Sequence, residues 1–178
     1  MTEQRVALIT GASQGLGFSL ALALAERGWD LVVDGRDGAR LAAAAERLRA
    51  AGGLVHAVAG DVADGAHRDQ LAREVASAGR IDALVNNASE LGPSPLPDLR
   101  GYDLNELLHV YQVNVIAPLA LTQLVLVGLV GDDGCIVNIT SDAAVEGYRG
   151  WGGYGSSKAA LEQLSQVLAV EEAGLRVY

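Results

Sequence analysis

The chain has 178 residues, of which 50% are hydrophobic and 20% are charged, with only four prolines. This composition predicts one compact domain with a sizeable core and argues against disorder. The net charge of −9 argues against a nucleic-acid-binding surface, and the single cysteine excludes an internal disulfide. The first residues are too weakly apolar for a signal peptide, and polar residues interrupt the apolar segment 113–130. We therefore expect a cytoplasmic protein without a membrane span.

Short apolar runs alternate with longer segments of helical period along the chain. Strands are predicted at 5–10, 30–35, 54–62, 81–88 and 135–141, with the start of a sixth at 175–178. Helices are predicted at 15–28, 38–53, 66–79, 103–129 and 154–172. Strands that are apolar nearly throughout and separated by helices predict a parallel sheet covered on both faces. The expected fold class is α/β, a Rossmann-like doubly wound parallel sheet in a single domain over 1–178.

The sixth strand has barely begun when the sequence ends at Tyr178. An unfinished strand leaves unpaired backbone groups at the edge of a sheet. We therefore expect that the functional protein is longer and that the C-terminal part of the fold is missing from this sequence. An intact mass of 18.4 kDa in an active sample would contradict this expectation.

A glycine-rich turn, "TGASQGLG", follows the first strand directly. Its glycines are spaced G-x-x-x-G-x-G rather than in the G-x-G-x-x-G fingerprint. Glycines at a strand-to-helix turn let the backbone approach a pyrophosphate, and the next helix offers unpaired N–H groups. Glycines also serve tight turns in proteins that bind nothing. The position after the first strand favours a nucleotide-binding turn, in which the expected cofactor-binding residues are Gly11, Ser13, Gln14, Gly15, Leu16 and Gly17.

The end of the second strand, "VVDGRDGARL", bears on the choice of nucleotide. An acidic residue at this point favours a free ribose 2′-hydroxyl, whereas arginine favours a 2′-phosphate. Asp34 comes one residue early, Gly35 takes the expected position and Arg36 follows. The pattern predicts that NADP(H) is preferred over NAD(H). Two alternatives stay open: Arg36 as an ordinary loop residue, and Asp34 reaching the ribose hydroxyls.

Two further strand ends carry candidate nucleotide contacts. Asp61 and Val62 follow the third strand, where an adenine ring could be bound. Asn87 and Ala88 follow the fourth strand, within "NNAS". Ligands of open α/β sheets bind just outside the carboxyl ends of the strands. An asparagine at such a point can equally cap its own turn.

Taken in order, these motifs resemble the short-chain dehydrogenase/reductase family. The matches are "TGASQGLG", "DV", "NNA", an asparagine in the long helix, a serine after the fifth strand and "YGSSK", and they span nearly the whole chain. The resemblance implies an NAD(P)(H)-dependent oxidoreductase with a small carbonyl or alcohol substrate. The catalytic group that it implies is Asn114, Ser141, Tyr154 and Lys158.

The chemistry of carbonyl reduction fits this group. A forming alkoxide needs a proton donor, and a free phenol, with a pKa near 10, needs help to exchange protons at neutral pH. A nearby ammonium favours the phenolate, and Tyr154 and Lys158 are four residues apart on one helix face. In the family this lysine also holds the nicotinamide ribose, so both residues count among the expected cofactor contacts. Ser141 could donate a hydrogen bond to the substrate carbonyl, or could merely satisfy local backbone.

Asn114 is linked to Pro118, four residues later in the same helix. Proline has no N–H, so the Asn114 carbonyl loses its helical partner and must bond water or another group. In the family, a water at this carbonyl relays protons to solvent. Pro118 could equally be only a packing kink.

The segments 89–102 and 142–154 are expected to line the substrate side, with Tyr148 and Trp151 weakly favouring an apolar or ring-bearing carbonyl compound. Ser89 stands where the family usually has glycine. The helices 103–129 and 154–172 are too apolar for one buried face, and the resemblance suggests that they pair in a homodimer or homotetramer. The three histidines form no metal-ligand pattern, so no metal is expected. Alternatives are a dehydratase or epimerase on the same scaffold, and a non-catalytic nucleotide-binding or redox-sensing protein.

Overall fold

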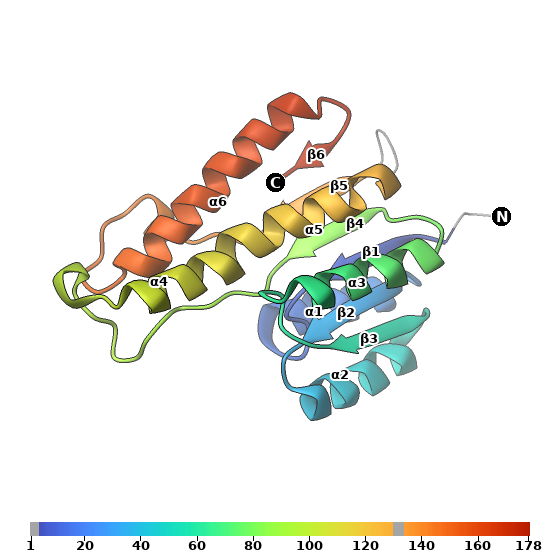
Figure 1. The fold of residues 1–178 in the computed structure, drawn as a ribbon. Coiled ribbons are helices and arrows are strands. Elements are labelled where there is room, and N and C mark those ends of the chain that lie inside the picture. The colour runs from blue at the N-terminus through green and yellow to red at the C-terminus, as the bar shows by residue number, and fades with distance from the viewer. Residues whose placement is uncertain (1–3, 130–133) are drawn as a thin grey trace.

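The computed structural model describes residues 4–129 and 134–178. Its centre is a parallel sheet whose strands are ordered β3-β2-β1-β4-β5-β6 (Figure 1). The strands are β1 (Val6–Ile9), β2 (Asp30–Gly35), β3 (Val55–Ala59), β4 (Ala83–Asn86), β5 (Cys135–Asn138) and β6 (Arg176–Val177). The doubly wound α/β prediction is confirmed.

Helices connect successive strands. They are α1 (Gly15–Ala25), α2 (Gly38–Ala51), α3 (Gly65–Ser77), α4 (Leu104–Tyr111), α5 (Ala117–Val125) and α6 (Gly152–Glu171). A π-helical turn, η2 (Gln112–Ile116), joins α4 to α5, and α6 runs alongside this long helical unit (Figure 1). Short 3-10 turns are η1 (Leu99–Gly101), η3 (Leu126–Gly128) and η5 (Asp142–Ala144).

Each face of the sheet builds its own core, because successive strand residues point to opposite faces. In β1, Ala7 and Ile9 enter one cluster and Leu8 enters the other. The first cluster is closed by α1 and α2, and the second by α3 and α5, with α6 contributing at its edge. The helical members that fill them include Ala21, Ala25, Leu41 and Leu48 on one side and Leu71, Val75, Leu121 and Val125 on the other.

The strand order reverses between β1 and β4. The chain runs from β1 outward to β3, returns to β4 beside β1, and then runs outward on the other side. Ligands of doubly wound sheets bind at such a switch point, outside the carboxyl ends of the strands. The turns after β1 and β4 therefore face a common crevice.

Several element boundaries differ from the sequence predictions. The predicted single helix 103–129 is divided by the π turn, and Pro118 lies in the first turn of α5. Proline has no N–H to donate to the Asn114 carbonyl, so the regular α-helical bonding pattern cannot continue through this point, where the structure has a π turn. The strand predicted at 54–62 is only five residues long and is exposed at His56, Ala57 and Ala59, because it is the edge of the sheet.

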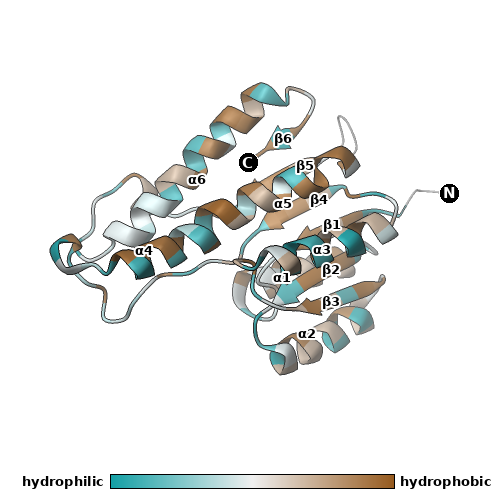
Figure 2. Cartoon of the chain, viewed as in Figure 1, coloured by the Kyte–Doolittle hydropathy of each residue, from teal (hydrophilic) through white to brown (hydrophobic). Residues whose placement is uncertain are grey.

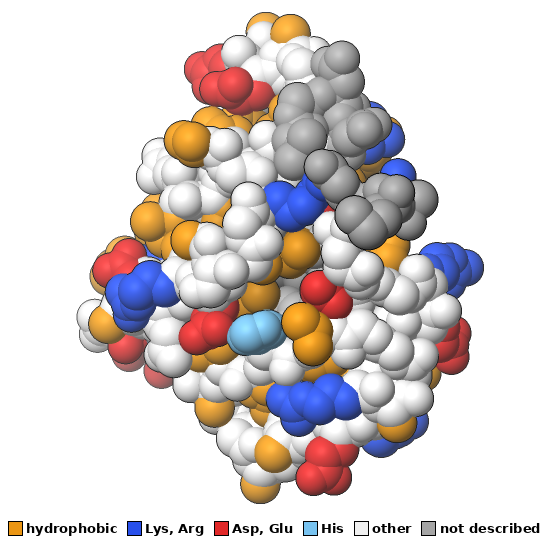
Figure 3. Space-filling model, turned by 90° about the vertical axis from the view of Figure 1, so that its right-hand side faces the viewer, with side chains coloured by type: hydrophobic (Ala, Val, Ile, Leu, Met, Phe, Trp, Pro, Cys, Tyr) orange, Lys and Arg blue, Asp and Glu red, His pale blue; other side chains and the backbone are white. Residues whose placement is uncertain are grey.

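The unit Leu104–Gly128 is long and apolar enough to cross a membrane, with a mean hydropathy of 1.7 over its best window. Half of that window is buried inside the fold, and core helices pass the same test. Apolar residues are visible along α4, α5 and α6 in Figure 2. The side of the molecule where the strands begin carries scattered charges of both signs over its described part (Figure 3).

Candidate functional site

A cavity of about 430 Å³ lies outside the carboxyl ends of β1, β2, β3 and β4. Its lining residues are Gly11, Ser13, Gln14, Gly15, Asp34, Gly35, Arg36, Asp37, Arg40, Gly60, Asp61, Val62, Asn87, Ala88, Ser89 and Val113. A volume of this size suits a nucleotide-sized ligand. The cavity thus brings together segments separated by up to about a hundred residues.

The glycine-rich turn is held from the β4 side by Thr10 and Asn87. The Asn87 side-chain amide donates to the carbonyls of Thr10, at 2.9 Å, and Gly11, at 3.1 Å. The Thr10 hydroxyl accepts from the amides of Asn87 and Ala88, both at 3.0 Å. Gly17 packs so closely here that a Cβ atom would lie 2.5 Å from the Gly11 carbonyl oxygen. The turn is therefore fixed by the protein itself.

The start of α1 is open to an anion. Gln14 stands at the N-cap position, yet its side chain makes no capping hydrogen bond to the helix. Its Oε1 atom accepts from Arg40 Nη1 at 2.8 Å instead. The first amides of a helix carry partial positive charge and bind phosphate readily. The cavity and the open helix start fit the diphosphate of a dinucleotide.

Asp34, which the sequence left open as a ribose ligand, is fully buried and committed elsewhere. Its Oδ1 atom accepts from the Gly11 amide at 2.6 Å, and its Oδ2 atom lies 3.1 Å from His67 Nε2. Both carboxylate oxygens therefore have partners inside the protein, while Asp34 also lines the cavity, and its contact with the ribose hydroxyls stays an untested alternative.

Two arginines, Arg36 and Arg40, line the cavity at the end next to β2. Arg36 forms an ion pair with Glu90, Nη1 to Oε2 at 3.1 Å, while Arg40 lies 3.7 Å from Asp37. Both guanidinium groups are more than half exposed. Exposed ion pairs are weak, so an incoming phosphate can replace these partners.

Of the expected cofactor contacts, Gly11, Ser13, Gln14, Gly15, Arg36, Asp61, Val62, Asn87 and Ala88 line the cavity. Leu16, Gly17, Tyr154 and Lys158 do not. Leu16 is 53% exposed on the rim, whereas Gly17 is buried behind the turn. Asp61 also accepts from the Ala63 amide at 2.9 Å, which caps its own loop.

Tyr154 and Lys158 lie in the first turns of α6. The Lys158 ammonium is 5.6 Å from the centroid of the Tyr154 ring and donates to the Ile139 carbonyl at 2.8 Å. Lys158 is 2% exposed, and burial lowers its pKa to about 8. No described residue hydrogen-bonds the Tyr154 hydroxyl, which leaves it available to a ligand.

Asn114 connects the cavity to α6. It is fully buried in the π turn, and its Oδ1 atom accepts from the Glu90 amide at 2.7 Å and the Ser89 hydroxyl at 3.2 Å. Its Nδ2 atom donates to the Glu90 carbonyl at 2.8 Å and to Ser157 Oγ at 2.9 Å. Ser89 lines the cavity and Ser157 precedes Lys158, so Asn114 fixes the two parts of the site relative to each other.

Ser141 begins the 3-10 turn η5, which packs on the start of α6. A Cβ atom on Gly155 would lie 2.5 Å from the Ala143 carbonyl, so Gly155 permits this contact. Ser141 Oγ accepts from the Ala143 amide at 3.2 Å and donates to Asp142 Oδ1 at 3.0 Å. Trp151 meets the Tyr154 ring edge-on, with centroids 5.7 Å apart. Among the described residues, no cluster of three His, Cys, Asp or Glu could hold a metal ion.

Comparison with known proteins identifies the lineage of this site. The family model described as "short chain dehydrogenase" matches residues 5–178. This chain belongs to the short-chain dehydrogenase/reductase family. An uncharacterized oxidoreductase of Mycobacterium tuberculosis is 34% identical over 170 residues, covering 95% of this chain and 64% of the relative. The chain spans less than two thirds of the length of the first curated relatives, 64% and 65%.

Solved structures agree with this assignment. A metagenomic short-chain oxidoreductase in complex with NADP superposes with a TM-score of 0.89 at 30% identity, over 97% of this chain and 78% of that chain. An NAD+-bound xylitol dehydrogenase superposes with a TM-score of 0.90 at 27% identity, over 99% of this chain and 69% of that one. Because these relatives bind different nucleotides, the family alone does not decide the cofactor of this short-chain dehydrogenase.

Sequence reasoning missed three parts of this site. Arg40 was passed over because it lies inside a predicted helix, although the spacing of four from Arg36 was readable. Thr10 was quoted as part of the turn without a role. No partner was predicted for His67 from the sequence; it is buried, and its contact with Asp34 joins residues 33 positions apart.

Proposed function

We propose that this short-chain dehydrogenase is an NADP(H)-dependent oxidoreductase that interconverts a small carbonyl compound and its alcohol. The observation that carries the proposal is the pairing of Tyr154 with the buried Lys158 ammonium, 5.6 Å from the ring centroid. A nucleotide-binding module has no use for a buried cation beside an unbonded phenol. Asn114 ties this pair to the nucleotide cavity through Ser89 and Ser157.

The residues have distinct roles in the proposed reaction. Bound NADP(H) supplies or accepts the hydride. The Tyr154 hydroxyl gives its proton to the substrate oxygen during reduction and takes it back during oxidation. The Lys158 ammonium stabilises negative charge on the Tyr154 oxygen, and the Ser141 hydroxyl donates to the substrate oxygen. A water at the Asn114 carbonyl, to which Pro118 cannot donate, would give Lys158 a path for recovering a proton from solvent.

The proposed cofactor preference rests on charge at the β2 end of the cavity. Arg36 and Arg40 both line it, and the carboxylate of Asp34 is withdrawn into the protein. A guanidinium binds phosphate oxygens with charge-assisted hydrogen bonds, whereas a free 2′-hydroxyl gains little from two cations. We therefore assign a 2′-phosphate to this end.

Assembly through the α4–α5 unit and α6 belongs to the same proposal. Leu104 and Leu108 in α4, Val127 in η3 and Val170 in α6 are each more than 60% exposed. Pairing the helices across a two-fold axis in a homodimer or homotetramer would cover these side chains. A cytoplasmic location is proposed with it, as expected from the sequence.

The test follows NADPH oxidation at 340 nm against a panel of ketones and aldehydes, using the full-length gene product. We expect turnover of at least one small apolar or ring-bearing carbonyl compound. Tyr154→Phe should bind NADPH with unchanged affinity and lose turnover by about 10²–10⁴-fold. Equal rates for wild type and Tyr154→Phe would refute the mechanism, and tight binding without any turnover would favour a non-catalytic role.

A further inference from the structure

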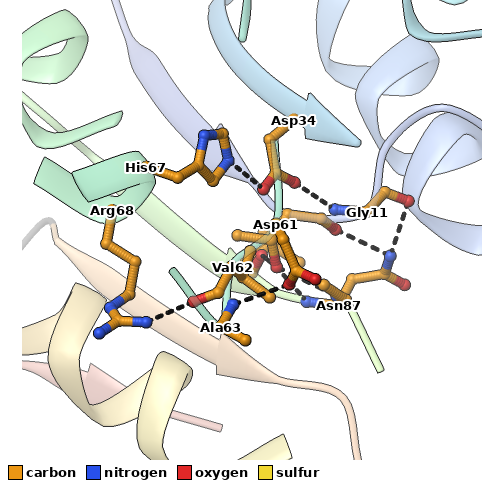
Figure 4. A network of polar contacts seen from close by, with 11 residues as sticks. Gly11, Asp34, Asp61, Val62, Ala63, His67, Arg68 and Asn87 are labelled. Carbon is orange, nitrogen blue, oxygen red and sulfur yellow. Dashed lines mark hydrogen bonds and ion pairs between the residues drawn. The ribbon is translucent and has the colours of Figure 1, made fainter. Parts of the chain in front are cut away.

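A buried histidine–carboxylate contact lies beneath the glycine-rich turn (Figure 4). His67 comes from α3 and Asp34 from β2, and their side chains are 5% and 1% exposed, with 3.1 Å between His67 Nε2 and Asp34 Oδ2. Neither residue is among the proposed hydride- or proton-transfer groups. Polar side chains are rarely buried this completely unless they are paired, so this contact requires an explanation.

Asp34 holds the start of the turn through two acceptors. Its carboxylate accepts from the Gly11 amide at 2.6 Å, and its main-chain carbonyl accepts from the Ala12 amide at 2.9 Å. Gly11 has φ +65°, which other residues rarely adopt, so this conformation depends on such support. With Asn87 bonded to the Gly11 carbonyl, the turn is held from both sides (Figure 4).

His67 in turn holds Asp34. The ring occupies the space that a side chain at residue 60 would need: a Cβ atom on Gly60 would lie 2.6 Å from His67 Cγ. Without His67, one oxygen of a fully buried carboxylate would have no partner, which is costly. Asp34 would then have reason to turn toward the cavity that it lines, and away from Gly11.

We propose that Asp34 and His67 are positioning residues for the cofactor: His67 orients Asp34, and Asp34 fixes Gly11 and Ala12 so that the open amides at the start of α1 face the diphosphate. This inference rests on the proposed nucleotide-binding function. The inference can be separated from the proposed cofactor preference, because NADPH and NADH share the diphosphate and differ only in the 2′-phosphate. Disturbing the pair should weaken both cofactors equally, whereas changing Arg36 or Arg40 should weaken NADPH alone.

The experiment measures dissociation constants for NADPH and for NADH by fluorescence titration, with thermal melting of each protein alongside. The variants are His67→Leu, His67→Gln and the double variant Asp34→Leu/His67→Leu. The glutamine of His67→Gln does not reproduce the packing of the ring, but its side-chain amide can donate to Asp34 from near the Nε2 position. His56→Leu is the matched control, since His56 also contacts a carboxylate, Glu74 at 3.0 Å, at the half-exposed sheet edge.

We expect His67→Leu to weaken NADPH and NADH by the same factor, about tenfold or more, and His67→Gln to recover most of the loss. The double variant should regain thermal stability, because an apolar pair can replace a buried polar one, yet keep the weak binding of both cofactors. His56→Leu should bind both cofactors as the wild type does.

Three results would overturn the inference: wild-type affinity in His67→Leu, a loss confined to NADPH, or a double variant that regains affinity together with stability. The last result would reduce the pair to a folding role. Wild-type protein that binds neither NADPH nor NADH would instead refute the proposed function, and the inference with it.

Discussion

The turn after β1 and the first turns of α6 differ in how many hydrogen-bond partners their polar groups have within the protein. At the turn, the Gly11 amide, the Gly11 carbonyl and both Asp34 oxygens have partners within the protein. At the start of α6, the Lys158 ammonium is buried with a single acceptor, the Ile139 carbonyl, and no described residue bonds the Tyr154 hydroxyl. The first region is fixed before any ligand arrives, while the second holds reactive groups at a cost in stability.

The largest effect should come from Lys158→Met, which separates activity from stability. We expect turnover to fall by about 10²–10⁴-fold, because the cation beside Tyr154 is gone. We expect the free energy of unfolding at pH 7 to rise by about 1–3 kcal/mol, because an ammonium no longer has to be buried. Steady-state kinetics and urea denaturation measure the two effects.

The size of this stability gain depends on pH. The pKa of Lys158 is lowered from 10.5 to about 8 in the folded protein, so between these values the unfolded chain binds the extra proton. The free energy of unfolding of the wild type should therefore rise between pH 8 and pH 10.5. The difference in unfolding free energy between Lys158→Met and the wild type should shrink over the same range. Arg149→Met, which breaks the exposed ion pair with Asp98, is the control and should leave the free energy of unfolding nearly unchanged at both pH values, because solvent screens this pair. A variant less stable than the wild type at pH 7 would contradict the comparison.

At the glycine-rich turn, a single added methyl group should be harmful. Gly17→Ala places a Cβ atom 2.5 Å from the Gly11 carbonyl oxygen, where hydrogen bonds from Asn87 and to Asp34 already hold Gly11 in place. We expect a loss of about 1–3 kcal/mol in unfolding free energy and a matching weakening of cofactor binding. Gly101→Ala is the control, since nothing lies within 4 Å of its added Cβ. Equal stability of the two variants would show that the turn is not rigid.

The titration of Lys158 can be observed directly, because it is the only lysine in the sequence. In protein labelled with 13C at the lysine Cε, the side-chain signal of Lys158, assigned by its loss in Lys158→Met, should titrate near pH 8. Since the ammonium is lost above that pH, kcat/KM for carbonyl reduction should fall by about tenfold per pH unit there. A lysine signal that titrates near pH 10.5 would contradict the expected fall of kcat/KM above pH 8.

Features that depend on neighbouring residues in the sequence, such as strands and helices, were predicted well. Apolar strand segments between helical segments predicted the sheet, whereas the division of the long helix 103–129 by a π turn was not predicted. What the sequence could not predict were contacts between distant residues. Nothing near Asp34 in the sequence shows that His67 will meet it, so the sequence could not predict that Asp34 has a partner inside the protein.

The catalytic assignments stand differently. Tyr154, Lys158, Ser141 and Asn114 were named through a family resemblance, and their catalytic roles stay predictions. Tyr154 and Lys158 share the first turns of α6, as their spacing predicted. The side chain of Asn114, however, proves to be a structural link with four hydrogen bonds, which the sequence argument on its carbonyl did not address.

The smallest effect concerns Arg40, the cavity residue that sequence reasoning passed over. Its guanidinium is tied to Gln14 and Asp37 near the same end of the cavity as Arg36. Because both arginines are more than half exposed, each contact with a 2′-phosphate should contribute only about 1 kcal/mol, or roughly fivefold in affinity. Arg40→Leu and Arg36→Leu should each reduce the preference for NADPH over NADH by that factor, with NADH binding unchanged. Salt should weaken NADPH binding more in the wild type than in either variant. If Arg40→Leu instead weakens both cofactors equally, Arg40 supports the glycine-rich turn through Gln14 and takes no part in choosing the cofactor.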